Sequence, residues 1–295
     1  VHERVFYEAV GKLLPQSQQA GYARLFSAWQ EQNTARFRQA MHLLATQLAV
    51  AGQDREAIES GSKGLLKSAL QVVGIGKNAE QQRQEKAMAS LVARLNTHSG
   101  VITRELLILH QLDPTDAHKI NSRIRENFAV RAPIDKAQAG LLGAMISGAA
   151  TGLSADLISG GLTLGTGALL GGVVGALTFA GAAWGFNSGT DRNEPTMQFT
   201  DAFLRTLVVA GVLRYLAVAH FGRGRGNFVE SEAPAFWQDE VEQAVARHDA
   251  ALLELWKEVR REKSPEQAAE RVLPVMSSIT SDTLARLYPD VARLV

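Results

Sequence analysis

Apolar residues recur at intervals of three and four positions through the first quarter of the chain. Between Val5 and Val73 they are separated mainly by Gln, Arg and Glu. This spacing places apolar side chains on one face of an α-helix. Pro15 and the sequence Gly52 to Asp54 are typical of helix ends. The pattern predicts two or three amphipathic helices, and the apolar positions that show the spacing include Leu25, Trp29, Phe37, Met41, Leu44 and Leu48.

Apolar residues show helical spacing in the rest of the chain as well, apart from one segment. We predict a turn at 74–78 and then helices over about 78–109, 116–128, 199–221 and 234–261. A last helix is expected to begin at Ser264, because Ser264, Pro265 and Glu266 form a typical start signal. No stretch shows the alternation of a strand. The expected fold class is therefore all-α, a multi-helix bundle that encloses or bears a glycine-rich hairpin.

The segment between Lys136 and Asp191 has a different composition, because its one formally charged side chain is Asp156. We expect a hairpin of two apolar helices here, with Asp156, Gly160 and Gly161 at its tip. Small residues spaced four apart leave a shallow ridge along a helix, so two helix backbones can approach closely. The residues expected to pack the two arms together are Gly140, Ala144, Gly148, Gly152, Gly167, Gly171 and Gly175.

The length of each arm favours membrane contact. About 20 residues at about 1.5 Å each reach about 30 Å, the thickness of the hydrocarbon core of a bilayer. Arg131 and Lys136 precede the hairpin and Arg192 follows it. Basic residues at both ends are expected to keep both ends on the cytoplasmic side. Asp156 argues against simple spanning, because a carboxylate deep in lipid is costly unless it is protonated or paired.

Two alternatives stay open for the same segment. The hairpin could be the buried core of a soluble scaffold that binds a partner protein through its charged C-terminal helices. It could also be hidden in a bundle and released at a bilayer, as in the pore-forming colicin domains that it resembles in architecture alone.

Composition and motifs argue against catalysis in this chain. The 31 Lys and Arg balance the 30 Asp and Glu, and there is no Cys, so no thiol chemistry and no Cys-based metal site is expected. The sequence GIGK at 74–77 lacks the remainder of a phosphate loop, and the histidines lack metal-site spacing. We expect no enzyme, no metal and no cofactor here. A loop with His220, Arg223 and Arg225 is the candidate contact for a lipid headgroup or a partner. We expect no nucleic-acid partner, because the loop has only two arginines.

Two stretches carry a resemblance to a known family: KAQAGLLGAMISGAATGLSADLISGGLTLGTGALLGGVVGAL at 136–177 and LRYLAVAHFGRGRG at 213–226. They resemble the DUF3482 domain, which follows a Ras-like GTPase domain in proteobacterial GTPases. The resemblance implies a preceding GTPase domain as a partner in cis, with GTP and Mg²⁺ bound there and not in this chain. It also fits the start without Met, which predicts a fragment of a longer protein.

The expected organisation has three regions: an amphipathic helical region at 1–135, the apolar hairpin at 136–190, and a C-terminal helical region at 191–295 that packs on the first. The function expected from these observations is that of a regulatory, membrane-associating module of a bacterial GTPase, located in the cytoplasm and in contact with the inner membrane.

Overall fold

The computed structural model describes residues 2–58, 75–114, 184–187, 196–221 and 236–288. In these ranges the chain forms seven helices and one small sheet, so the expected all-α class is confirmed for the bulk of the described chain. The helices are α1 (His2–Leu13), α2 (Gln16–Gln53), α4 (Ile75–Leu109), α8 (Asp201–Phe221), α9 (Phe236–Ala246), α10 (Asp249–Val259) and α11 (Pro265–Leu287).

The expectation that the chain contains no strand is wrong. Strands β1 (Arg55–Ala57), β2 (Trp184–Asn187) and β3 (Thr196–Phe199) form an antiparallel sheet with β3 in the middle. Three or four residues are too few for an alternating pattern to stand out in the sequence. The sheet brings together three segments that are far apart in the chain, and β2 lies inside the range 136–190 that we assigned to the hairpin.

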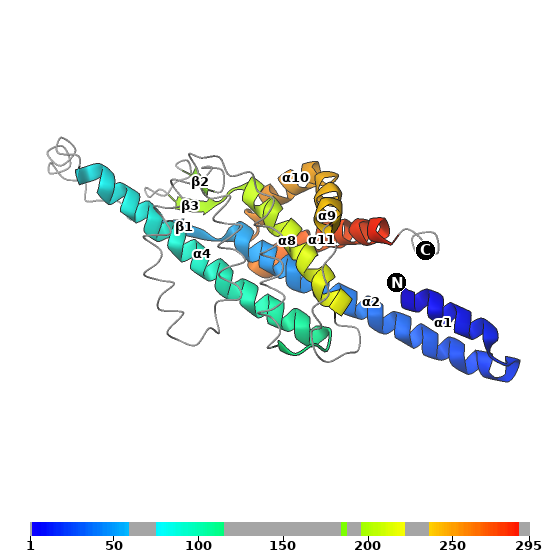
Figure 1. The fold of residues 1–295 in the computed structure, drawn as a ribbon. Coiled ribbons are helices and arrows are strands. Elements are labelled where there is room, and N and C mark those ends of the chain that lie inside the picture. The colour runs from blue at the N-terminus through cyan, green and yellow to red at the C-terminus, as the bar shows by residue number, and fades with distance from the viewer. Residues whose placement is uncertain (1, 59–74, 115–183, 188–195, 222–235, 289–295) are drawn as a thin grey trace.

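The core lies where α2, α4, α8 and α11 meet. Figure 1 shows α2 running through the middle of the described chain, with α4 and α8 along it. α11 packs on the same helix, and α9 and α10 pack on α8 and α11. The side chains of Met41, Leu44, Leu106, Val212 and Met276 are at most 1% exposed, and the helical spacing of such residues explains why these faces turn inward.

The first half of α2 projects from this core together with α1, as Figure 1 shows at the right. The buried residues of α2 begin only at Ala40. Tyr7 of α1 packs against Trp29 of α2, with ring centroids 4.8 Å apart, and its carbonyl accepts a 2.6 Å hydrogen bond from the Tyr22 hydroxyl. The projection is thus a two-helix hairpin that is held together by aromatic side chains.

The helix ends follow local chemistry. The Ser264 hydroxyl accepts a 3.3 Å hydrogen bond from Gln267 N, and Pro265 occupies the first turn of α11, which confirms the expected start. At the end of α4, Gln111 adopts a φ of 59° and Leu112 N donates to Leu107 O at 2.9 Å. These are the marks of a Schellman motif, which reverses the chain direction after α4.

Two boundaries differ from expectation. α4 begins at Ile75, inside the GIGKN stretch that we expected to be a turn. The helix predicted over 234–261 is divided into α9 and α10 at Arg247 and His248, although no Gly or Pro marks the break.

Candidate functional site

Of the side chains predicted to form a site, the structure describes one. His220 lies in the last turn of α8, and its ring meets the ring of Trp237 edge to face at a centroid distance of 5.3 Å. Its described contact is therefore with α9. The other predicted site residues lie outside the described residues: Gly140, Ala144, Gly148, Gly152, Asp156, Gly160, Gly161, Gly167, Gly171, Gly175, Arg223 and Arg225.

The small sheet is the described feature nearest to the low-charge segment in the chain. Its strand β2 comes from the C-terminal end of that segment. Trp184 pairs with Phe199 of β3, and Asn187 pairs with Thr196. The middle strand in turn pairs with β1, where Arg55 lies opposite Gln198. The sheet hydrogen bonds thus attach the end of the segment to the folded helices, and the expected boundary of the hairpin at residue 190 stays a prediction.

The junction between β3 and α8 is closely packed. The rings of Phe199 and Phe203 stack with centroids 4.8 Å apart, and each side chain is 1% exposed. Thr200 Oγ1 accepts a hydrogen bond from Phe203 N at 3.3 Å, as a helix cap does. Arg260, the residue directly after α10, donates through Nη2 to Phe199 O at 3.2 Å and to Asp201 Oδ1 at 2.5 Å. The strand and the start of the helix therefore form one unit with the end of α10.

The outer strand β1 is fixed by a second set of polar contacts. Arg94 of α4 donates through Nε and Nη2 to Asp54 at 2.9 to 3.1 Å and through Nη1 to Glu56 at 2.7 Å. Gln53 Nε2 donates to the carbonyls of Val259 and Glu262 at 2.9 and 3.0 Å. These bonds tie the junction of α2 and β1 to α4 on one side and to the end of α10 on the other.

A buried polar chain crosses the helical core. Arg214 of α8 is 2% exposed, and its Nη1 donates to Gln47 Oε1 of α2 at 2.8 Å. Gln47 Nε2 donates to Ser99 Oγ of α4 at 2.5 Å, and Thr103 Oγ1 donates to Ser99 O at 2.8 Å. Burial lowers the pKa of the Arg214 guanidinium to about 10, so the group is still a cation at neutral pH. Its Nε has no hydrogen-bond partner among the described residues.

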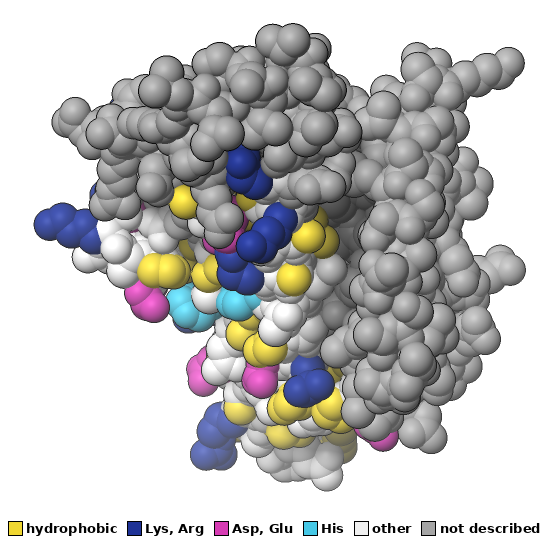
Figure 2. Space-filling view, turned by 90° about the vertical axis from the view of Figure 1, so that its left-hand side faces the viewer, with side chains coloured by type: hydrophobic (Ala, Val, Ile, Leu, Met, Phe, Trp, Pro, Cys, Tyr) yellow, Lys and Arg dark blue, Asp and Glu magenta, His cyan; other side chains and the backbone are white. Residues whose placement is uncertain are grey.

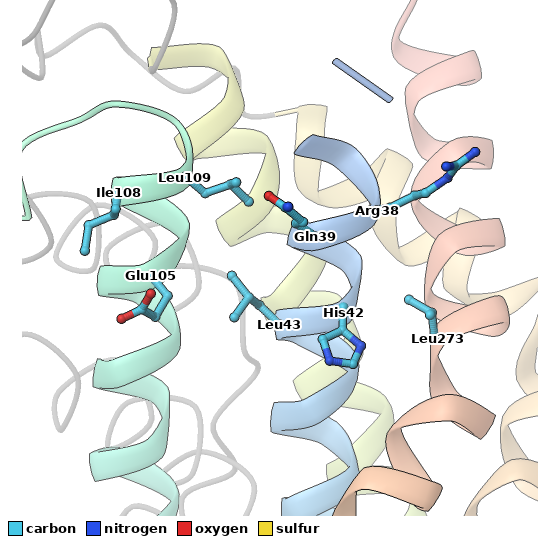
Figure 3. A pocket seen from close by; sticks show the side chains of 8 residues that line it. All are labelled: Arg38, Gln39, His42, Leu43, Glu105, Ile108, Leu109 and Leu273. Atoms are coloured by element: carbon cyan, nitrogen blue, oxygen red, sulfur yellow. The ribbon is translucent and has the colours of Figure 1, made fainter. Parts of the chain in front are cut away.

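A pocket of about 540 Å³ lies beside α2, between this helix and its neighbours α4 and α11 (Figure 3). Leu43 and Gln39 face α4 across it, and His42 and Arg38 point toward α11. The residues on the facing helices are Glu105, Ile108, Leu109 and Leu273. Apolar side chains and both signs of charge line the pocket together, which singles out no ligand class.

Within the described ranges, no group of three His, Cys, Asp or Glu side chains is placed to hold a metal ion. Among those residues, one helix is long and apolar enough to cross a membrane, the stretch Asp201–His220 of α8. Of an 18-residue window of this stretch 78% is buried inside the protein, as expected for a core helix. A helix of 20 residues is about 30 Å long, so the sheet and His220 stand at opposite ends of α8.

Residues 2–275 match the family model described as Domain of unknown function (DUF3482). The chain belongs to the DUF3482 family. The resemblance drawn from the glycine-rich stretch and the end of α8 is therefore confirmed. No curated protein and no solved structure matches the chain of this DUF3482 protein.

Sequence reasoning missed the sheet contacts and the buried polar chain of this DUF3482 domain. Arg214 interrupts an otherwise apolar helix, and that interruption was the available signal, since a charge on a buried face needs a polar partner. Nothing in the sequence pairs Arg214 with Gln47, because the two residues are 167 positions apart.

Proposed function

We propose that this DUF3482 chain is a helical regulatory module of a bacterial GTPase, and that its glycine-rich segment contacts or inserts into the inner membrane. The observation that carries the proposal concerns α8. This helix is apolar enough to cross a bilayer, yet 78% of an 18-residue window in its apolar stretch is buried against its neighbours. The described body thus uses its own apolar helix as core, which leaves 137–183, with Asp156 as its one charge, as the lipid-contacting candidate.

The attachment of this segment supports the same proposal. β2 follows the segment directly, and its pairing with β3 fixes the segment's C-terminal end to α8 through the Phe199 and Phe203 stack. A folded body that holds an apolar segment at a fixed point can present it to a bilayer without itself unfolding. In this arrangement the helices stay on the cytoplasmic side.

The regulatory part of the proposal rests on the resemblance to domains that follow a Ras-like GTPase domain. GTP and Mg²⁺ would be bound by that preceding domain and not by this chain. Nucleotide state can shift a helical module between two packings when its contacts differ between them. The longer protein should therefore bind membranes to different extents with GDP and with a non-hydrolysable GTP analogue.

Vesicle flotation tests the membrane part directly. The parent chain is compared with a variant in which residues 137–183 are replaced by a short Gly-Ser linker, a boundary that spares β2. Circular dichroism and thermal unfolding check that both fold. The parent alone should float with vesicles that contain anionic lipid. Equal flotation of both chains, or of neither, would contradict the proposal, and release of a trapped dye would favour the pore-forming alternative.

A second candidate function, binding of a protein partner, is favoured by the α1 and α2 projection. Its side chains Phe6, Leu13 and Leu25 are 63%, 85% and 61% exposed. Exposed apolar side chains on a protruding hairpin are typical of interaction sites. If the parent fails to float and Leu13→Gln with Leu25→Gln changes its sedimentation coefficient at high concentration, the scaffold interpretation becomes the better one.

A further inference from the structure

The two ends of the described chain present different surfaces. The sheet end faces the viewer in Figure 2, and there the described apolar, basic and acidic side chains are intermixed. At the other end the α1 and α2 projection exposes Leu25 and, at the tip between the two helices, Leu13, which is 85% exposed. Exposed apolar side chains on a protruding element are typical of a contact with another protein.

One face of the projecting half of α2 has the pattern of a helix that pairs with another helix. Its residues follow one another at alternating steps of four and three positions, and all are exposed: Gly21, Leu25, Ala28, Gln32 and Ala35. This spacing is that of the contact face of paired helices. A Cβ on Gly21 would meet nothing within 4 Å, so the face is open there. α1 covers the border of this face instead, where Tyr7 contacts Tyr22 and Trp29.

Two opposite charges lie along the other border of the face. Arg24 and Glu31 are seven residues apart, so they flank the face on the same side. Both are exposed, and neither has an ion pair among the described residues. If two copies of α2 pack antiparallel, these borders meet, and Arg24 of each copy lies beside Glu31 of the other. The two-fold axis then passes near Ser27 and Ala28. A parallel pair would instead bring this border against the one that α1 covers.

The antiparallel register also brings the tip of one projection to the pocket of the other copy. At 1.5 Å per residue, the tip at residues 13–15 lies about 20 Å from the axis along α2. Gln39 and Leu43, which line the pocket, lie about 17 to 23 Å from the axis in the other direction. A two-fold axis makes every contact occur twice, so each tip meets the pocket of the other copy.

The pocket suits this tip in its lining and in its charge. Its volume is about 540 Å³, and its apolar lining consists of Leu43, Ile108, Leu109 and Leu273. Leu13 is the exposed apolar side chain that would enter it. The neighbouring Lys12 is exposed, as is Glu105 of the pocket, and neither has an ion pair among the described residues. Arg38 points toward α11, on the other side of the pocket from Glu105 (Figure 3). A cation at the tip thus has an anion to meet.

We infer that two copies of this chain pair through their α1 and α2 projections, with the α2 helices antiparallel and each tip in the pocket of the other copy. The inference rests on the second candidate function, binding of a protein partner by the projection, and names that partner. It is independent of the membrane proposal.

Sedimentation velocity of the full chain over a wide range of concentration tests the pairing. Ala28→Arg places two cations together at the axis and should raise the dimer dissociation constant on the order of 100-fold or more. Ala23→Arg is the matched control, because Ala23 is exposed on the same helix and lies about 140° around it from Ala28. The control should dimerise as the parent does. Circular dichroism checks that each variant folds.

Charge reversal tests the register. Arg24→Glu and Glu31→Arg should each weaken the dimer on the order of 10-fold, because each places like charges together at two symmetric positions. The double reversal should recover most of the loss, since opposite charges meet again. Leu13→Asp should also weaken the dimer, because it brings a carboxylate into an apolar pocket beside Glu105.

The outcomes separate this inference from the functions proposed above. Selective loss in Ala28→Arg, with recovery in the double reversal, supports the pairing. A parent that stays monomeric, or a dimer that Ala28→Arg leaves intact, overturns it, and the projection would then need a different protein as its partner. Additive losses in the two reversals overturn the antiparallel register, and an unaffected Leu13→Asp overturns the contact of tip and pocket. The membrane proposal is tested by flotation and is unchanged by any of these results.

Discussion

Arg214 of α8 and Gln47 of α2 are joined by a 2.8 Å hydrogen bond inside the core, where the arginine is 2% exposed. Gln47 is its hydrogen-bond acceptor among the described residues, and Gln47 also donates to Ser99 of α4. One amide thus connects three helices. Because the described acceptor of this buried cation is a neutral amide, the packing of α8 should be sensitive to both residues.

Replacing Gln47 by Leu should destabilise the chain, because it leaves the Arg214 cation buried without its acceptor. A hydrogen bond to a charged group contributes about 1.5–3 kcal/mol, so we expect a loss of that order in the free energy of unfolding. Urea unfolding measures it. The double variant Gln47→Leu with Arg214→Leu should recover much of the loss, since replacement of a buried polar pair by apolar groups is often neutral. Additive losses would contradict the coupling.

His98 should make the fold less stable in mild acid. Burial lowers the pKa of this imidazole below its ordinary value of 6.5. The unfolded chain therefore takes up a proton at a higher pH than the folded chain, and stability falls as the pH drops below about 6.5. Thermal unfolding of the parent and of His98→Gln from pH 8 to pH 5 should show a steeper decline for the parent. Parallel profiles would mean that His98 does not contribute.

Two glycines of α2 should respond in opposite ways to replacement by Ala. A Cβ on Gly52 would lie 2.7 Å from Val259 Cγ1, whereas a Cβ on Gly21 would meet nothing within 4 Å. Overpacking in a core costs about 1–3 kcal/mol, so Gly52→Ala should lower the melting temperature. Gly21→Ala should raise it, because Ala in an exposed helix is favoured by about 1 kcal/mol. A stabilised Gly52→Ala would contradict the close contact of α2 with α10.

Arg94 should stabilise the fold through the geometry of its guanidinium group more than through its charge. Its guanidinium binds Asp54 and Glu56 together and so joins α4 to β1. The side chain is 44% exposed, and we expect Arg94→Ala to cost about 1 kcal/mol in urea unfolding. Arg94→Lys should recover little of this, because an ammonium group cannot form the forked arrangement. Full recovery with Lys would show that charge alone is sufficient.

The sequence predicted the helices well, because their signals are local. The start of α11 at Ser264 and the apolar helix that became α8 follow from capping residues and spacing. The sheet could not be predicted, since its order depends on contacts between Arg55, Gln198 and Gly185, which are far apart in the chain. The division of α9 from α10 at His248 coincides with a tertiary contact, since the His248 imidazole lies 3.2 Å from Ser278 Oγ of α11.

The candidate site also has one part that the sequence predicts and one part that depends on tertiary contacts. Composition alone singled out the low-charge segment, because the absence of charge over a long stretch is visible in any sequence. The sequence does not predict where the segment is attached to the helices. That attachment depends on the pairing of β2 with β3 and on the Arg260 contacts with Phe199 and Asp201.

The most direct test of the central claim is a fluorescence measurement at one position in the segment and one on the body. The chain has no Cys, so Leu169→Cys and Ala251→Cys each give a single labelling site, the second on an exposed position of α10. Each is labelled with a polarity-sensitive dye and mixed with vesicles that contain anionic lipid. We predict that the dye at residue 169 shifts to the blue and is quenched by lipids labelled in their acyl chains, while the dye at residue 251 is unchanged. An unchanged spectrum at residue 169 would contradict the claim that this segment enters the membrane.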